Sequence, residues 1–224
     1  MAVWKRPQLT LPKVVRWSKY RKRGTRRQDT LQHTLSIMVL ADCVLSDINQ
    51  YVAFNKEFVS LALRYHDFGE GETAQGDTLY IDKTVAGDIA EVDAFAARFG
   101  IVLGEEVMEA FLLQFAKNAE KMGKYRQQLR RIKKEHKIEC LVFDALERFD
   151  YFLYAYEQYV EHKKGTIGTK ILVQVLRHNV PHFKRLAREL RGFKEVLWTP
   201  ELAQWCEMFL ERYKGLWIEK KGEK

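Results

Sequence analysis

The stretch Leu61-Ala-Leu-Arg-Tyr-His-Asp-Phe-Gly-Glu-Gly-Glu72 decides how the whole chain is interpreted. An apolar run with helical spacing leads to an adjacent imidazole and carboxylate, His66 and Asp67, and two glycines follow them. Removing this pair from water at the inner end of a buried helix costs free energy unless a cation or another partner compensates it. We therefore predict that His66 and Asp67 form half of a metal site.

A second imidazole is predicted to face the same site. His33 recurs with Ile37, Leu40 and Val44 at helical spacing, which places it on the inward face of its helix. A lone inward histidine is more often a core residue than a ligand. Here a second inward histidine with an attached carboxylate follows one helix later, and burying these groups together requires a cation.

The fourth predicted ligand lies far downstream, in a helix through residue 150. Asp150 shares a face with Phe143, Leu146 and Leu153 at helical spacing, so it is expected to point inward. Asp144 competes for the role. Because Glu147 and Arg148 follow Asp144 at three and four residues, we interpret that group as a solvated charge network and choose Asp150. The predicted metal ligands are His33, His66, Asp67 and Asp150.

The order His, then His-Asp, then Asp, each in a helical apolar pattern, resembles the HD-domain metal-dependent phosphohydrolases. Within that superfamily the chain is most similar to the YfbR-type 5'-deoxynucleotidases. The resemblance spans roughly residues 14–160 and rests on Arg16-Trp17, Gln32-His33-Thr34, His66-Asp67 with Glu70, Gly76-Asp77 and Asp150. It implies an all-α fold, an HD-domain helical bundle with additional C-terminal helices.

The resemblance also implies roles for residues around the ligands. Glu70 would handle a proton and Asp77 would support it or contact the sugar, whereas Arg16, Trp17 and Lys83 would bind the substrate. Local alternatives remain for several of these residues. Glu72 competes with Glu70, Trp17 is equally suited to anchor the first helix in the core, and Asp77 alone is typical of a turn. The chain departs from the family at Gln32, where Glu is usual, and lacks the proline expected between Asp77 and Lys83.

The expected reaction follows from the ligand types. Two histidines and two aspartates leave open positions on an ion that accepts six ligands, which favours Mn, Co, Fe, Ni or Mg over a closed structural zinc site. We expect hydrolysis of (deoxy)nucleoside 5'-monophosphates to nucleoside and phosphate, by a homodimer as in the family. Alternatives are a dNTP triphosphohydrolase or another nucleotide polyphosphate hydrolase such as an alarmone hydrolase, or a non-catalytic helical module that binds RNA or an acidic partner.

The positive charge of the chain is concentrated at its beginning. The formal net charge is +8, but residues 1–27 hold ten cations and no acid, so the rest of the chain carries −2. Such a segment can steer anions toward a site, hold nucleic acid or simply remain solvated. A second basic stretch, residues 121–137, is interpreted as the solvated side of a helix.

Length and composition indicate one protein domain with a single core. The 224 residues are 46% hydrophobic and 30% charged, which is ordinary for a globular protein. We divide the chain into a basic arm and first helix (1–27), a phosphohydrolase core (28–165) and C-terminal helices that pack on it (166–224). The opening residues lack the apolar core of a secretory signal and no apolar run is expected to span a bilayer, so we expect a cytoplasmic protein without membrane contact. Three scattered cysteines without metal or redox spacing are expected to be reduced.

The expected helices follow the apolar periodicity. They cover residues 14–23, a segment beginning at Asp29 or Thr30, and then 58–66, 85–99, 105–120, 170–178, 182–194 and 200–217. Only residues 77–81 indicate a short strand.

Overall fold

The computed structural model describes residues 11–16, 28–73, 84–162 and 167–216, and this part of the chain is helical apart from two very short strands. The prediction of an all-α protein is confirmed. The α-helices are α2 (Thr30–Asn49), α3 (Lys56–Tyr65), α4 (Phe68–Glu72), α5 (Val85–Leu112), α6 (Arg126–Glu135), α7 (Lys137–His162), α8 (Ile167–Glu189), α9 (Arg191–Val196) and α10 (Pro200–Arg212). Short 3-10 helices are η2 (Leu11–Lys13), η4 (Leu113–Lys121) and η5 (Gly123–Tyr125).

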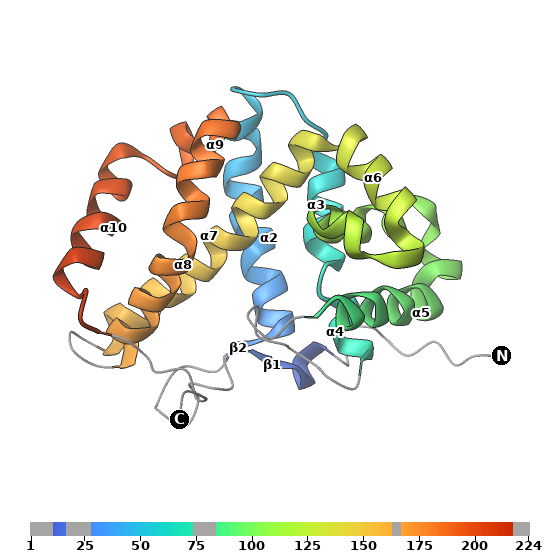
Figure 1. The fold of residues 1–224 in the computed structure, drawn as a ribbon, viewed down its shortest axis with the longest axis horizontal. Helices are drawn as coiled ribbons and strands as arrows, with labels where there is room; N and C mark the ends of the chain where they lie inside the picture. The colour runs from blue at the N-terminus through green and yellow to red at the C-terminus, as the bar shows by residue number, and fades with distance from the viewer. Residues whose placement is uncertain (1–10, 17–27, 74–83, 163–166, 217–224) are drawn as a thin grey trace.

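Helix α7 crosses the middle of the molecule, with α3 to α6 on one side and α8 to α10 on the other (Figure 1). It packs against α2, α3 and α8, so elements from both ends of the sequence meet on it. Gly168 of α8 lies close to the backbone of α7, because an added Cβ there would lie 2.2 Å from the backbone oxygen of Gln158. A side chain at this position would therefore separate α8 from α7.

Side-chain caps explain where several helices begin. Asp29 accepts from the backbone N–H of Gln32 at 2.9 Å, while the Gln32 side chain accepts from the Asp29 N–H at 3.1 Å. This reciprocal capping box fixes the start of α2 one turn before His33, with Asp29 as the cap and Thr30 as the first helical residue. Asn55 and Thr84 cap α3 and α5 more simply: their side-chain oxygens accept from the backbone N–H groups of Phe58 and Gly87.

The buried apolar residues form one continuous cluster that includes both the central and the C-terminal helices. Phe95 of α5 stacks on Phe111 with ring centroids 3.7 Å apart and an interplanar angle of 3°. Phe183 of α8 lies 5.6 Å from Phe193 of α9 and 5.0 Å from Trp198 by ring centroids. Because these aromatic groups bury large areas, they hold the helices on each side of α7 in place.

Of two helix boundaries predicted inside the core, one is confirmed and one is corrected. The segment α5 is interrupted at Gly104, where two helices were predicted to separate; its φ of 77° and ψ of 173° are not helical, and glycine adopts such a φ readily. Gly100 does not interrupt the first of these helices. A break near Pro181 was also expected, but α8 continues through it. Val180 and Phe183 on either side of the proline are buried, so tertiary packing maintains the helix there.

The segment before α2 is also corrected. Val14 was predicted to begin a helix, but Val15–Arg16 form strand β1, which pairs antiparallel with β2 (Gln28–Asp29). In this register Arg16 lies opposite Gln28, just before α2 begins. The remainder of the predicted helix 14–23, and the predicted strand 77–81, lie outside the described residues.

By length and composition alone, α2 could cross a membrane, contrary to the expectation that no apolar run would qualify: its mean hydropathy is 1.3 over the most apolar window. The core helix of a soluble protein passes the same test. Ile37, Ala41 and Leu45 on its inner face are buried in the core, and α9 contacts its C-terminal end. The inner face of α2 thus belongs to the core, whereas Leu35 and Val39 on its outer face are exposed.

The three cysteines are free, as predicted. Cys43 is exposed, Cys140 half-buried and Cys206 buried.

Candidate metal centre

The predicted pair His66 and Asp67 lies in the bend between two helices. His66 is the residue that ends α3, and Asp67 immediately precedes α4. Consecutive side chains on a straight helix point about 100° apart, but the bend brings Asp67 Oδ1 to 3.2 Å from His66 Nε2. Both side chains are buried. The chain thus directs an imidazole nitrogen and a carboxylate oxygen toward one point.

Helix α2 brings His33 to the same point. His33 is fully buried, and its Nε2 lies 3.2 Å from Nε2 of His66. The opposite nitrogen of each ring faces a pure acceptor: His33 Nδ1 lies 2.7 Å from Asp150 Oδ2, and His66 Nδ1 lies 2.7 Å from the carbonyl oxygen of Leu63. Each Nδ1 therefore carries a proton that it donates, and in the neutral ring each Nε2 offers a lone pair.

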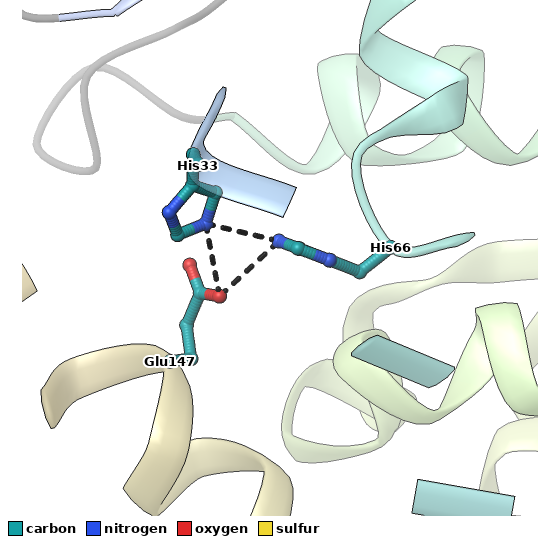
Figure 2. A group of neighbouring side chains, drawn as sticks. All are labelled: His33, His66 and Glu147. Atoms are coloured by element: carbon teal, nitrogen blue, oxygen red, sulfur yellow. Dashed lines mark hydrogen bonds and ion pairs between the residues drawn. The ribbon is translucent and has the colours of Figure 1, made fainter. Parts of the chain in front are cut away.

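Helix α7 adds a carboxylate that the sequence analysis did not choose. Figure 2 shows Glu147 directed at the two histidines, with Oε2 at 3.5 Å from His33 Nε2 and 3.2 Å from His66 Nε2. Ligand atoms held about 2.1 Å from one ion lie about 3.0 Å apart in octahedral and about 3.4 Å apart in tetrahedral geometry. The separations of 3.2, 3.2 and 3.5 Å are close to these values, so His33, His66 and Glu147 could hold a metal ion. These three residues and the adjacent Asp67 are called the central group.

Asp150 occupies a different place from the one predicted. Its Oδ2 accepts from His33 Nδ1, on the edge of the ring away from His66, and its Oδ1 accepts from Ser36 Oγ at 2.6 Å. Asp150 and Glu147 are three residues apart on α7 and point to the same side of the helix, because three residues turn an α-helix through nearly a full turn. Glu147 therefore faces the central group, whereas Asp150 lies behind His33.

Asp144, the competing ligand candidate, lies in a charge network that is partly the one predicted. Asp144 pairs with Arg148 at 3.0 Å and with Arg185 at 2.9 Å, so a charge network is present. It is not solvated as predicted, because Arg148 is buried and Asp144 is half-buried. Glu147 was placed in that network, but its side chain is 19% exposed and turns to the histidines instead. The signal available in the sequence was its spacing of three residues from Asp150.

Arg16 provides a cation beside the carboxylate of Asp67. Its guanidinium donates to Asp67 Oδ2 at 2.9 Å and to the hydroxyl of Tyr151. Tyr151 in turn stacks on His33 with ring centroids 5.7 Å apart and an angle of 19°. Since Arg16 is only 4% exposed, the β1–β2 pairing delivers a buried positive charge next to the central group.

Four predicted site residues remain, and the structure describes one of them, Glu70. Glu70 lies buried on α4, three residues after Asp67. Trp17, Asp77 and Lys83 lie outside the described residues.

The pKa values of the central group are shifted by burial and by the neighbouring charged side chains. Burial lowers the pKa of both histidines, and Arg16 also lowers that of His33, but the neighbouring carboxylates outweigh these effects and raise both pKa values. Burial raises the pKa of Asp67 and of Glu147, but the charge of His66 above all holds both below their usual range. In the absence of a metal ion, protons on the imidazoles therefore supply the positive charge that the carboxylates require.

A second group of possible ligands lies near the start of α7. Ligand atoms of Glu109, Glu135 and His136 lie within 4.8 Å of one another, but this group is partly exposed. Arg131 donates to Glu109 at 3.0 Å and lies 3.8 Å from Glu135. Arg131 already pairs with both carboxylates, so we assign no ion to this group.

Comparisons of the chain with protein-family models, with curated proteins and with solved structures find no match. The assignment of a function therefore rests on the residues and geometry of the central group, together with the motif resemblance.

Proposed function

We propose that this protein is a metal-dependent phosphohydrolase that converts (deoxy)nucleoside 5'-monophosphates to nucleoside and phosphate. The observation that carries the proposal is the meeting of His33 Nε2, His66 Nε2 and Glu147 Oε2 at 3.2–3.5 Å. Two imidazole nitrogens and a carboxylate in contact inside a protein require positive charge, which either protons on the rings or a metal ion can supply. His33 and the His66-Asp67 pair are also part of the motif on which the resemblance to HD-domain phosphohydrolases rests, whereas Glu147 takes the ligand position that the resemblance gives to Asp150.

The ligand atoms in the site suit an ion that keeps some coordination positions for water or substrate. His33, His66 and Glu147 supply three ligand atoms. Asp67 lies beside them, with Oδ1 3.2 Å from His66 Nε2, and the resemblance implies that it would be a further ligand. A six-coordinate ion such as Mn, Co, Fe, Ni or Mg would keep further positions for water and substrate. When bound, it would supply Lewis acidity toward water and toward a phosphate oxygen.

The surrounding residues have complementary roles in this proposal. Arg16, which is held beside Asp67, would orient the phosphate and stabilise the charge that develops on it. Glu70 would take a proton from the attacking water and return it to the oxygen of the departing nucleoside, as the P–O ester bond breaks. Trp17 and Lys83 would contact the nucleotide and Asp77 would support Glu70, as the resemblance implies.

The choice of a monophosphate over a polyphosphate is part of the proposal from the resemblance. Among the described residues, Arg16 is the cation that contacts Asp67, and it could bind one phosphate group. Homodimer formation and a cytoplasmic location remain part of the proposal from the resemblance and the sequence.

The direct test is a hydrolysis screen of nucleoside mono-, di- and triphosphates with each candidate ion. We expect orthophosphate from monophosphates in the presence of Mn²⁺ or Co²⁺ and loss of turnover in Asp67→Ala. Glu201→Ala, on an exposed part of α10, is the matched control and should retain full activity. Release of inorganic triphosphate from dNTPs would establish the polyphosphate alternative. Turnover that Asp67→Ala leaves unchanged, or no turnover with any ion, would overturn the proposal.

A further inference from the structure

We propose that Asp150, held by Ser36, is a positioning residue that fixes the tautomer of His33 and thereby strengthens ion binding at His33 Nε2. This inference rests on the proposed function for the presence of an ion, but it concerns metal affinity and ring protonation rather than hydrolysis. In this role Asp150 contacts Nδ1 of the His33 ring and does not contact the ion itself.

Both oxygens of Asp150 are engaged away from the central group. Oδ2 accepts from His33 Nδ1 at 2.7 Å and Oδ1 accepts from Ser36 Oγ at 2.6 Å. Ser36 lies on α2, the same helix as His33, and three residues later. The two contacts therefore fix the carboxylate against one edge of α2, and Asp150 is only 1% exposed.

The contact determines which nitrogen of His33 offers a lone pair. A carboxylate only accepts hydrogen bonds, so Nδ1 must carry the proton and Nε2 must face His66 and Glu147 without one in the neutral ring. Without Asp150, the neutral ring could place its proton on Nε2, where it would block an ion. The carboxylate thus selects the form that binds metal.

The two histidines differ in the acceptor that their Nδ1–H group contacts. His66 Nδ1 donates to the neutral carbonyl of Leu63, whereas His33 Nδ1 donates to a buried carboxylate. A carboxylate partner raises the basicity of a ligating imidazole more than a carbonyl does, because the partner is charged. We infer that His33 is the more strongly donating of the two imidazoles and that Asp150 is the reason.

The experiment uses Co²⁺ as the probe, in the full-length protein and without substrate. Co²⁺ affinity and the visible absorption of bound Co²⁺ are measured for wild type, Asp150→Asn, Ser36→Ala and Glu147→Gln. We expect Asp150→Asn to weaken Co²⁺ binding roughly 10- to 100-fold, the usual effect of losing an outer hydrogen-bonding partner, with the absorption bands unchanged. Ser36→Ala should weaken binding less, and Glu147→Gln should alter the bands because it changes a ligand.

A second measurement reads the tautomer without any metal. Nitrogen chemical shifts of His33, recorded by NMR in chelator-treated protein above the histidine pKa, should show the proton on Nδ1 in wild type and a mixture in Asp150→Asn. Bands in Asp150→Asn that change as in Glu147→Gln would show that Asp150 is itself a ligand and would overturn the inference. Unchanged Co²⁺ affinity together with an unchanged tautomer would also overturn it.

The outcomes separate this inference from the proposed function. Normal Co²⁺ binding with the expected Asp150 effect, but no hydrolysis of any nucleotide, would support the positioning role and overturn the phosphohydrolase. Wild-type protein that binds no Co²⁺ would overturn both.

Discussion

His33 Nε2 and His66 Nε2 lie 3.2 Å apart, and the Nδ1 atom of each ring is already engaged with an acceptor on its other side. The two rings can approach this closely only when positive charge lies between or upon them. In metal-free protein that charge is protonic, since the pKa of each histidine is raised by the nearby carboxylates against the effect of burial. A metal ion would replace those protons.

Metal affinity is therefore expected to rise with pH. An ion must displace protons from His33 and His66, whose pKa values lie above the usual 6.5, so binding should strengthen from pH 6 through the raised pKa values and release protons. Calorimetric titration with Co²⁺ in buffers of different ionisation enthalpy measures both effects. Affinity that is constant between pH 6 and pH 8, with no proton release, would contradict this expectation.

The stability of metal-free protein should depend on pH in the opposite sense. Because the folded pKa values of His33 and His66 are raised, their contribution to stability is complete below pH 6.5 and is lost as the pH rises through the folded values. The lowered pKa values of Asp67 and Glu147 give a contribution that is present above their ordinary range and lost in acid. Urea unfolding with a chelator should show the free energy of unfolding falling above pH 6.5. His66→Gln should flatten this alkaline decline, and a free energy that rises from pH 6.5 to pH 9 in wild type would be the contrary result.

Glu147 should contribute more to metal binding than Asp144, which lies three residues earlier on the same helix. Glu147→Gln removes a charged oxygen that faces both imidazoles at 3.2–3.5 Å, and we expect Co²⁺ affinity to fall by more than the roughly 10- to 100-fold of an outer partner. Asp144→Asn breaks ion pairs with Arg148 and Arg185, so it should lower thermal stability but not Co²⁺ affinity. Equal loss of affinity in both variants would argue against Glu147 as a ligand.

Arg16 should affect catalytic efficiency if the proposed function is correct. Arg16→Ala removes a charged hydrogen-bond donor beside Asp67, and such a bond is worth about 1.5–3 kcal/mol, or roughly 10- to 100-fold in kcat/KM for a nucleoside monophosphate. Arg64→Ala is the matched control, because Arg64 is exposed on α3 two residues from His66. Steady-state kinetics of both variants with Mn²⁺ make the comparison, and equal kcat/KM values would exclude a phosphate-binding role for Arg16.

The close contact between α7 and α8 gives a prediction about stability alone. Gly168→Ala would place a methyl group 2.2 Å from the backbone oxygen of Gln158, so the helices must separate, and we expect a loss of about 1–3 kcal/mol or more. The matched control is Gly100→Ala in α5, where nothing lies within 4 Å of the added Cβ. That variant should gain about 0.5–1 kcal/mol from helix propensity. Denaturant unfolding of both proteins tests the pair, and a Gly168→Ala variant as stable as wild type would refute the predicted clash.

The sequence was informative where the controlling interactions are local. Periodicity placed His33 on an inward face, as observed. The glycines after Asp67 do not end the helix, because both lie within α4 and the bend that brings His66 and Asp67 together precedes them. The choice between Glu147 and Asp150 could not be made in this way. Both lie on one side of α7, and the rotation of α7 against α2 decides which of them faces the central group, so the answer depends on tertiary packing.

Non-local strand pairing and packing also explain why two secondary-structure predictions were wrong. Val15–Arg16 became a strand because Gln28–Asp29 pairs with it, and local periodicity contains no information about that partner. Pro181 did not end α8, because the buried residues around it hold the helix together. Local propensity was overridden in both places by contacts with distant parts of the chain.

The candidate ligands come from α2, from the bend after α3 and from α7, and the last of them in the sequence is Glu147. During translation, a ribosome must therefore release most of the chain before the third ligand atom can reach the other two. The early part of the nascent protein would present two imidazoles and one aspartate without the arrangement that selects an ion. Cofactor loading would then be a late step of biosynthesis, completed after α7 has docked.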